Sequence, residues 1–267
     1  MKGIAAIVAH WLVWLLAAGA VQAQESTTLD ELAKLKQNPL SGLRQVTLQN
    51  QLYPNFHSTG QTENVLSVQV IWPVSLGNEW SIVTYTILPV ISQPGLEPGD
   101  SQVWGLGDTT MTLIATPKKI GTLIWGAGAV IGLPTRTNSV LGSDRMGAGP
   151  ALALFVQPGP WTLGVLLENI WSFGGSGNNE VNQFSAQYWV TYNLPQGWFL
   201  QSNATITANW EADAKDRWTV PVSAGFGKVF NVGKQSVSAS VLGYYNTVGP
   251  RSGSDWSVSC GISLLFP

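Results

Sequence analysis

The chain of 267 residues has an unusual balance of residue types: only 10% are charged, whereas Gly occurs 29 times and Trp 13 times. Typical soluble domains carry roughly 25% charged residues, so this chain has too few charges to cover an ordinary water-exposed surface. The formal net charge of -2 excludes the basic surface that nucleic acid would need as a partner. The single cysteine, Cys260, excludes an intramolecular disulfide framework and a cysteine-built metal site.

Residues 1–23 have the pattern of an export signal. Lys2 precedes the apolar run Ile4 to Ala20, and the small-residue pattern that ends at Ala23 predicts cleavage before Gln24. We therefore assign residues 1–23 to a signal peptide. The alternative is an uncleaved anchor helix, which the short apolar core and the cleavage-like end disfavour.

Residues 24–43 are predicted to form a periplasmic segment with a short helix. Ser26 or Thr27 is the expected cap, Asp30 and Glu31 lie in the first turn, and Pro39 stops the helix. The short apolar stripe of this helix consists of Leu29, Leu32, Ala33 and Leu35. We expect the helix to precede the main fold and to pack against its mouth.

Residues 44–267 alternate between polar and apolar side chains, and turn residues divide them. Beyond the N-terminus no apolar run reaches the ~18 to 20 residues that a spanning helix needs. In lipid every backbone N–H and C=O must be paired within the protein, so such a chain crosses a membrane as a closed barrel. Twelve segments are near the ~9 to 11 residues of a tilted transmembrane strand. The expected strands are 44–55, 62–74, 79–91, 106–116, 121–133, 144–157, 160–173, 182–194, 197–210, 216–230, 234–246 and 254–266.

The connections between these segments alternate in length. The tight turns "SLGN", "PKKI", "QPGP", "PQG" and "NVGK" fall at every second junction, and most of the links between them are longer. Short periplasmic turns, long external loops and an even strand count are typical of bacterial outer-membrane barrels. The sequence therefore predicts an all-β, transmembrane, antiparallel up-and-down β-barrel of about 12 strands in the cell outer membrane.

Aromatic residues form two predicted belts, as expected for amphipathic rings at the two membrane interfaces. One belt lies beside the short turns and the other near the long loops. The first comprises Trp72, Trp80, Trp161, Tyr192 and Trp198, and the second Trp104, Trp171, Trp210, Trp218 and Trp256. The alternative is a soluble β-sandwich with tryptophans in its core. Alternation alone does not separate the two folds, so composition, export signal and loop lengths favour the barrel.

Several short motifs occur in a characteristic order along the predicted strands. They are "GLGD" (Gly105 to Asp108), "GLPT" (Gly132 to Thr135), "GAGP" (Gly147 to Pro150), "YNLP" (Tyr192 to Pro195) and a terminal "LLFP". From about Leu40 to Pro267 the chain resembles the bacterial outer-membrane family labelled MetA-pathway of phenol degradation, or transporter-like. The resemblance implies an outer-membrane barrel that takes up or exports small, aromatic or hydrophobic compounds.

If the polar faces point inward, neutral hydrogen-bonding groups dominate the lumen. The candidate lumen-lining residues are Gln69, Thr110, Thr112, Glu168, Gln187, Gln201, Asn203, Thr205 and Arg217. Glu168 and Arg217 are candidates for an ion pair inside the barrel, since the lipid face tolerates neither charge. Such an ion pair would either select solutes by charge, or the two residues would only stabilise one another and select nothing. Asp108 is the candidate outer-mouth residue, which would guard the entrance or cap a turn.

The chain offers little for catalysis, and we expect neither an enzyme nor a bound cofactor or metal. His57 is the only histidine after the signal, and Ser58 beside it would point away from it on a strand, so a serine triad is unsupported. The acidic loops at 97–100 and 211–216 lack the ligand spacing of a calcium loop.

The sequence thus predicts an outer-membrane channel or transporter for passive passage of small polar, amphipathic or aromatic molecules. The expected partners are outer-membrane lipid, the barrel-assembly machinery and a small-molecule solute. The alternatives are a closed structural or adhesive barrel and, less favoured, an outer-membrane lipid-modifying enzyme.

Overall fold

The computed structural model describes residues 28–56, 60–95, 100–119, 121–176, 180–251 and 253–267. The predicted signal peptide, its cleavage site, and both His57 and Ser58 lie outside these ranges. Among the described residues no helix is long and apolar enough to cross a membrane.

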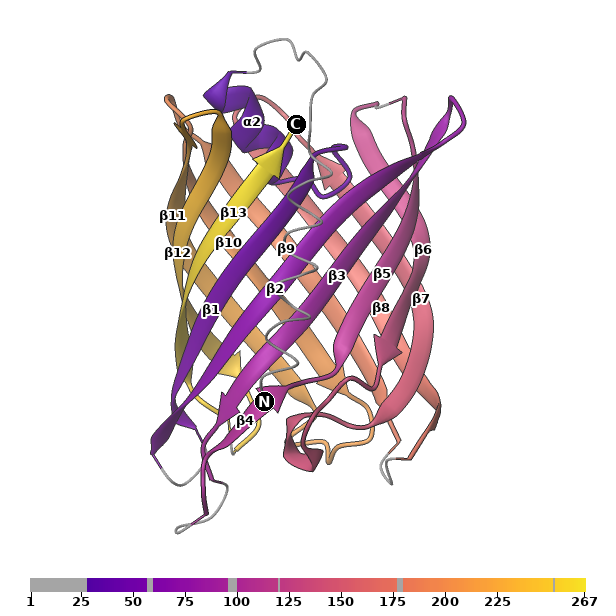
Figure 1. Ribbon diagram of the computed structural model, residues 1–267, viewed down its shortest axis with the longest axis vertical. Helices are drawn as coiled ribbons and strands as arrows, with labels where there is room; N and C mark the ends of the chain where they lie inside the picture. The colour runs from indigo at the N-terminus through magenta and orange to yellow at the C-terminus, as the bar shows by residue number, and fades with distance from the viewer. Residues whose placement is uncertain (1–27, 57–59, 96–99, 120, 177–179, 252) are drawn as a thin grey trace.

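The described residues form one antiparallel sheet that closes on itself as a barrel (Figure 1). Consecutive strands pair with each other, β2 pairs with β3, and β1 pairs with β13, so the sheet has no free long edge. The strands are β1 (Arg44–Phe56), β2 (Gln61–Leu76), β3 (Trp80–Gln93), β4 (Val103–Leu106), β5 (Thr109–Pro117), β6 (Leu123–Leu133), β7 (Arg145–Val156), β8 (Trp161–Gly175), β9 (Asn182–Asn193), β10 (Trp198–Asn209), β11 (Trp218–Val232), β12 (Gln235–Val248) and β13 (Trp256–Phe266).

The predicted fold class is confirmed, with one interruption in the fourth strand. β4 and β5 both pair with β3, so they are two parts of one strand and the barrel has twelve strands. The break falls at Gly107 and Asp108. A side chain at Gly107 would begin only 2.7 Å from Ile91 Cδ1 and 3.1 Å from the Leu141 carbonyl oxygen. Glycine is therefore needed where the loop that carries Leu141 crosses the end of this strand.

The two faces of the barrel differ as a membrane protein requires. Successive side chains on a strand point to opposite faces, and on β10 and β13 the outward set is apolar whereas the inward set is largely hydroxyl and amide. Leu200, Phe226 and Ile262 are 52%, 53% and 56% exposed on the outer wall. A soluble sandwich would place such side chains in its core, so the soluble alternative is wrong.

Aromatic side chains contact one another at both ends of the outer wall. Trp161 and Tyr192 have ring centroids 4.8 Å apart beside the short turns. Trp210 and Trp218 lie 5.7 Å apart beside the longer loops. These contacts lie where amphipathic rings occupy the two interfaces of a bilayer.

The helix α2 (Leu29–Lys36) lies at the end of the barrel that holds the short turns and the end of β13 (Figure 1). Thr28 is its N-cap: the Thr28 hydroxyl accepts from Glu31 N–H, and the Glu31 carboxylate accepts from Thr28 N–H. This reciprocal capping box satisfies two donors at the helix start. The predicted helix is confirmed, but its cap is Thr28 and not Ser26 or Thr27, which precede the described residues.

The ladder between β10 and β11 is interrupted in mid-strand. Residues 198–201 pair with 225–228, and residues 207–208 pair with 218–219. Within these fully described strands, residues 202–206 pair with β9 but have no ladder partner on β11. Pro221 contributes no N–H there, and β11 is irregular against β12 between Val220 and Pro221. The Ser223 hydroxyl accepts from Asn203 N–H at 2.8 Å and donates to the Asn203 carbonyl at 2.9 Å. A side chain thus replaces the missing backbone partners.

Candidate functional site

One side of the lumen, along β5 to β8, is filled by apolar side chains. Phe155 is 1% exposed and lies with its ring centroid 5.2 Å from that of Trp189. The ring of Phe155 covers Gly164, where a side chain would begin only 2.1 Å from it. Leu40, which follows α2, packs into the same cluster. We did not predict this apolar side of the lumen from the sequence, because the polar faces of the strands indicated a lumen dominated by neutral polar groups.

The other side of the lumen holds two polar cavities that follow one another along the barrel. The outer cavity has a volume of about 380 Å³ and the inner cavity, next to α2, about 100 Å³. Both are lined mainly by amides and hydroxyls of β1, β2 and β9 to β13. The residues common to both linings, here called the waist, are Gln49, Gln69, Tyr85, Gln187, Asn203 and Tyr244.

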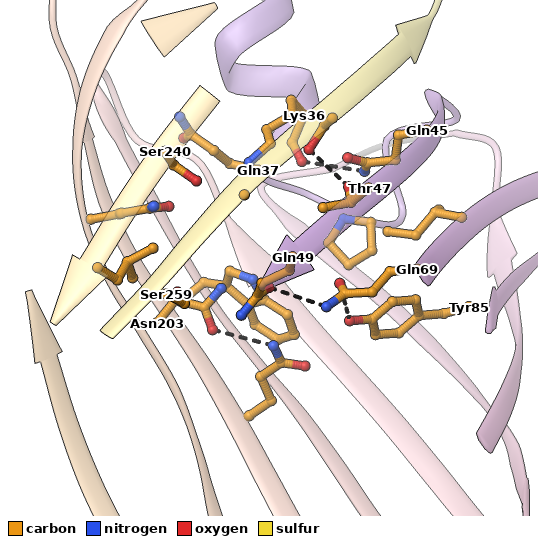
Figure 2. Close-up of a pocket in the computed structure, with 18 of the residues that line it drawn as sticks. Lys36, Gln37, Gln45, Thr47, Gln49, Gln69, Tyr85, Asn203, Ser240 and Ser259 are labelled. Carbon is orange, nitrogen blue, oxygen red and sulfur yellow. Dashed lines mark hydrogen bonds between the residues drawn. The ribbon is translucent and has the colours of Figure 1, made fainter. Parts of the chain in front are cut away.

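Hydrogen bonds between side chains hold the waist together (Figure 2). Gln69 Nε2 donates to Gln49 Oε1 at 3.1 Å, and the Tyr85 hydroxyl donates to Gln69 Oε1 at 3.1 Å. On the opposite strands Gln187 Nε2 donates to Asn203 Oδ1 at 3.2 Å. The waist is therefore a narrow, uncharged region whose groups can exchange these bonds for bonds to water or to a solute.

Polar contacts fix α2 across the inner mouth of the barrel. Lys34 Nζ donates to the carbonyls of Gln157 and Gly159 at 3.1 and 2.8 Å, in the turn between β7 and β8. Gln37 and Asn193 exchange two amide hydrogen bonds of 2.8 and 3.1 Å. These contacts tie the helix segment to the turns at the periplasmic end.

Apolar contacts complete the docking of α2. Leu32 and Ala33 are 2% and 0% exposed, and they pack with Phe199, Val229 and Leu265 of the barrel's inner face. The predicted apolar stripe therefore faces the barrel, as expected. At this end α2 therefore lies over the inner faces of β10, β11 and β13.

Lys36, the last residue of α2, lines the inner cavity together with Gln37 and Gln45 (Figure 2). Its side chain is half-buried, and the ammonium lies 5.4 Å from the centre of the Phe199 ring. Removal from bulk water disfavours the charged form, and this burial lowers the pKa of Lys36 to about 8. The position of this lysine could not be predicted from strand alternation, because Lys36 lies in the helix segment before the first strand.

The structure places five candidate lumen residues on the cavity walls. Gln69, Gln187 and Asn203 belong to the waist, Gln201 lines the inner cavity, and Thr205 lines the outer one. Tyr85 and Tyr244 were missed. In the middle of β3 the inward neighbours of Tyr85 are the apolar residues Val83 and Ile87, so alternation did not indicate a polar face there.

Glu168 and Thr112 are joined by a hydrogen bond of 2.5 Å in which the threonine hydroxyl donates. Ser185 donates to the second Glu168 oxygen at 3.3 Å. β6 and β7 lie between β5 and β8, and their paired inward residues, Gly128 and Ala151, are small enough for Glu168 to extend over them. Neither Glu168 nor Thr112 lines the two cavities described above. Thr110 pairs with Ile87, which lines the outer cavity, so the two share the inward face.

The predicted ion pair between Glu168 and Arg217 is wrong. Arg217 precedes β11 in an external loop, where its guanidinium donates to the Ala212 carbonyl at 3.4 Å and lies 5.7 Å from the Trp210 ring centre. Local contacts within one loop hold this arginine, whereas Glu168 is held by the hydroxyls of Thr112 on β5 and of Ser185 on the adjacent strand β9. The ion pairs formed among the described residues do not involve either of them.

Asp108 fastens the loop between β6 and β7. Its carboxylate accepts from Arg136 N–H at 3.2 Å, and from Ser143 N–H and the Ser143 hydroxyl at 2.7 and 3.0 Å. That loop contains the short helix η2 (Ser139–Leu141). Asp108 therefore shapes the outer loop, which is the turn-capping role that the sequence left open.

Two solved structures are similar to the fold. The crystal structure of the COG4313 outer membrane channel from Pseudomonas putida F1 superimposes with a TM-score of 0.62 at 18% identity, covering 84% of this chain and 96% of that one. A NanC porin structure gives a TM-score of 0.51 at 11% identity, covering 83% and 99%. No protein-family model and no curated protein matches the chain. At these identities the likeness shows a shared outer-membrane barrel fold.

Proposed function

We propose that the chain is a non-enzymatic channel of the outer membrane through which small molecules pass passively. The observation that carries this proposal is the pair of polar cavities that meet at the waist and reach from the outer half of the lumen to α2. In this proposal the 1–23 signal is cleaved on export. The barrel-assembly machinery inserts the mature chain, and outer-membrane lipid surrounds it.

The walls of the cavities favour small polar or amphipathic solutes. Amides and hydroxyls of the waist offer exchangeable hydrogen bonds, while Ile71 and Trp189 add an apolar surface to the inner cavity. A pore selects by its width and by the hydrogen-bonding groups on its wall. The same walls would suit the small aromatic compounds implied by the MetA-pathway resemblance, which we retain as part of the proposal. The similarity to a channel and to a porin agrees with this function.

A closed structural barrel is the second candidate, and one observation favours it. The waist side chains are bonded to one another, and α2 covers the inner mouth, so passage requires the helix or the waist to move.

Single-channel recording of the refolded mature chain in a planar bilayer separates the two candidates. The channel proposal expects discrete current steps, together with swelling of liposomes that contain the protein in small-solute solutions. Boiled and unboiled samples compared on a gel verify that the barrel has folded before each recording. A folded barrel with neither current steps nor swelling would leave the closed structural barrel as the function.

A further inference from the structure

Lys36 is the one charged side chain on the walls of the two lumen cavities. Every other described residue that lines them is neutral, and most carry an amide or a hydroxyl. The charge stands at the inner end, where α2 meets Gln45 and Thr47 of β1 (Figure 2). A solute that crosses the barrel through these cavities must therefore pass the positive charge of Lys36 at their inner end.

No carboxylate neutralises this lysine in the part of the chain that the structure describes. The ion pairs formed there lie in the external loops. On its own helix the Asp30 carboxylate accepts from Gly197 N–H at 2.6 Å, and Glu31 is held by the Thr28 cap. In the barrel wall Glu168 is bonded to hydroxyls and lies outside the lining of the cavity.

The other ionisable groups near the cavity do not supply a counter-charge either. Lys34 is a cation and is occupied by two backbone carbonyls. The phenols Tyr85 and Tyr244 face the cavity from β3 and β12, and each takes part in a neutral hydrogen bond. Among the described residues, the ammonium of Lys36 interacts only with the Phe199 ring, at 5.4 Å from its centre. An unpaired charge in a confined site is unfavourable, so an anion that enters gains from pairing with it.

The surroundings of Lys36 indicate the kind of anion that fits. The amide nitrogens of Gln37 and Gln45 each donate one hydrogen bond, to Asn193 and to the Lys36 carbonyl. The second N–H of each amide can donate to a carboxylate beside the lysine, as charge-assisted recognition of an anion requires. Across the cavity Ile71, Trp189 and Leu242 present an apolar surface. A volume of about 100 Å³ admits a small organic group and excludes a long chain.

We propose that the inner cavity is a binding site for small organic monocarboxylates, with the carboxylate on Lys36 and the apolar body against Trp189. The role of this site rests on the proposed channel function, because the site acts as an anion filter at the inner mouth only if solutes pass through the barrel. Binding itself does not depend on conduction, so the two ideas are tested separately.

The binding test uses benzoate and the refolded mature chain in detergent. Calorimetry is expected to show benzoate binding to the natural chain and to Lys36→Arg, with binding to Lys36→Met weakened about 10- to 100-fold, the range that a hydrogen bond to a charged group contributes. Benzyl alcohol, which lacks the charge, should not distinguish these proteins. Lys228→Met is the matched control, because Lys228 lies over the Trp198 ring on the outer wall at the same end. Equal benzoate affinity in the natural chain and Lys36→Met, or no benzoate binding to either, would overturn the proposal.

A second measurement follows the charge during conduction. In a salt gradient the natural chain should prefer anions to cations by about 100-fold, because one charge at about 10 Å in a medium of effective dielectric about 20 favours an anion roughly tenfold and disfavours a cation roughly tenfold. Lys36→Met should abolish this selectivity and Lys36→Glu should reverse it. Because the pKa of Lys36 is about 8, the selectivity should fall as the pH rises from 7 to 9. Currents without anion preference would refute the anion filter but would agree with the channel function. Benzoate binding without currents would refute the channel function but would agree with the binding site.

Discussion

Shortening Leu32 to alanine is expected to release α2 from the inner mouth of the barrel. Leu32 is 2% exposed and packs with Phe199, Val229 and Leu265. Buried Leu→Ala substitutions cost ~2 to 5 kcal/mol, depending on how far the site collapses. Here the cost acts on the docking of one short helix, because the strands keep their own ladders. A loss of ~3 kcal/mol changes the ratio of docked to undocked helix roughly 100-fold.

Two assays follow this release independently. Trypsin reaches Lys34 and Lys36 only when the helix leaves the mouth, so Leu32→Ala should be cleaved there much faster than the natural chain. Single-channel recordings should show a matching increase in the fraction of time spent open. Leu200→Ala is the control, because Leu200 is 52% exposed on the outer wall. If trypsin removes the segment while the current is unchanged, the helix does not limit passage and the reasoning is refuted.

Three further predictions concern the polar ties of the barrel. Replacing Glu168 by alanine leaves the Thr112 hydroxyl without its acceptor and should lower the free energy of unfolding by ~1 to 3 kcal/mol, whereas glutamine keeps an acceptor; urea unfolding in detergent that shows equal losses would contradict this. Asp108→Ala removes the acceptor that fastens the loop between β6 and β7, so limited proteolysis should cut that loop faster, and an unchanged rate would argue against the tie. Hydrogen bonds from Arg251 lower the pKa of Asp216 from 3.8 to about 2. Because the pKa of Asp216 is lowered in the folded chain, its ionised carboxylate stabilises the loop contact fully at pH values above the unfolded-state pKa. This stabilisation is lost as the pH falls through the folded-state pKa and the carboxyl becomes protonated. Protection of these loops from hydrogen exchange, taken relative to the intrinsic rate at each pH, should therefore fall between about pH 4 and pH 2 in the natural chain and be already lost at pH 5 in Arg251→Ala.

The strands were predictable from the sequence because each one carries its own signal. A residue period of two, with Leu200 facing lipid and Gln201 facing the lumen, needs no knowledge of any other strand. The turns and the cap of α2 are also local, and the cap, Thr28, lies one or two residues after the predicted Ser26 or Thr27. Membrane crossing followed from the scarcity of charge, which is a property of the whole chain.

The contents of the lumen were less predictable, because they depend on contacts between distant segments. Leu40 enters the barrel from outside the strands and fills space beside Phe155, which no period along one strand can reveal. Glu168 and Arg217 looked complementary as isolated charges inside a barrel. Arg217 lies in a loop outside the lumen, where it contacts residues of the same loop. Glu168 reaches Thr112 because the inward side chains of β6 and β7 between them are small.

The Ser223 bridge between β10 and β11 has a mechanical consequence for the barrel wall. A closed hydrogen-bond ladder resists a change in the barrel's circumference, because every strand pair must widen together. Here the five residues 202–206 of β10 are joined to β11 through the Ser223 hydroxyl instead of a backbone ladder. The wall is therefore most compliant along this line, and its amide hydrogens should exchange with solvent before those of the continuous ladder between β9 and β10. Lateral pressure of the bilayer should therefore deform this barrel first at the contact between β10 and β11.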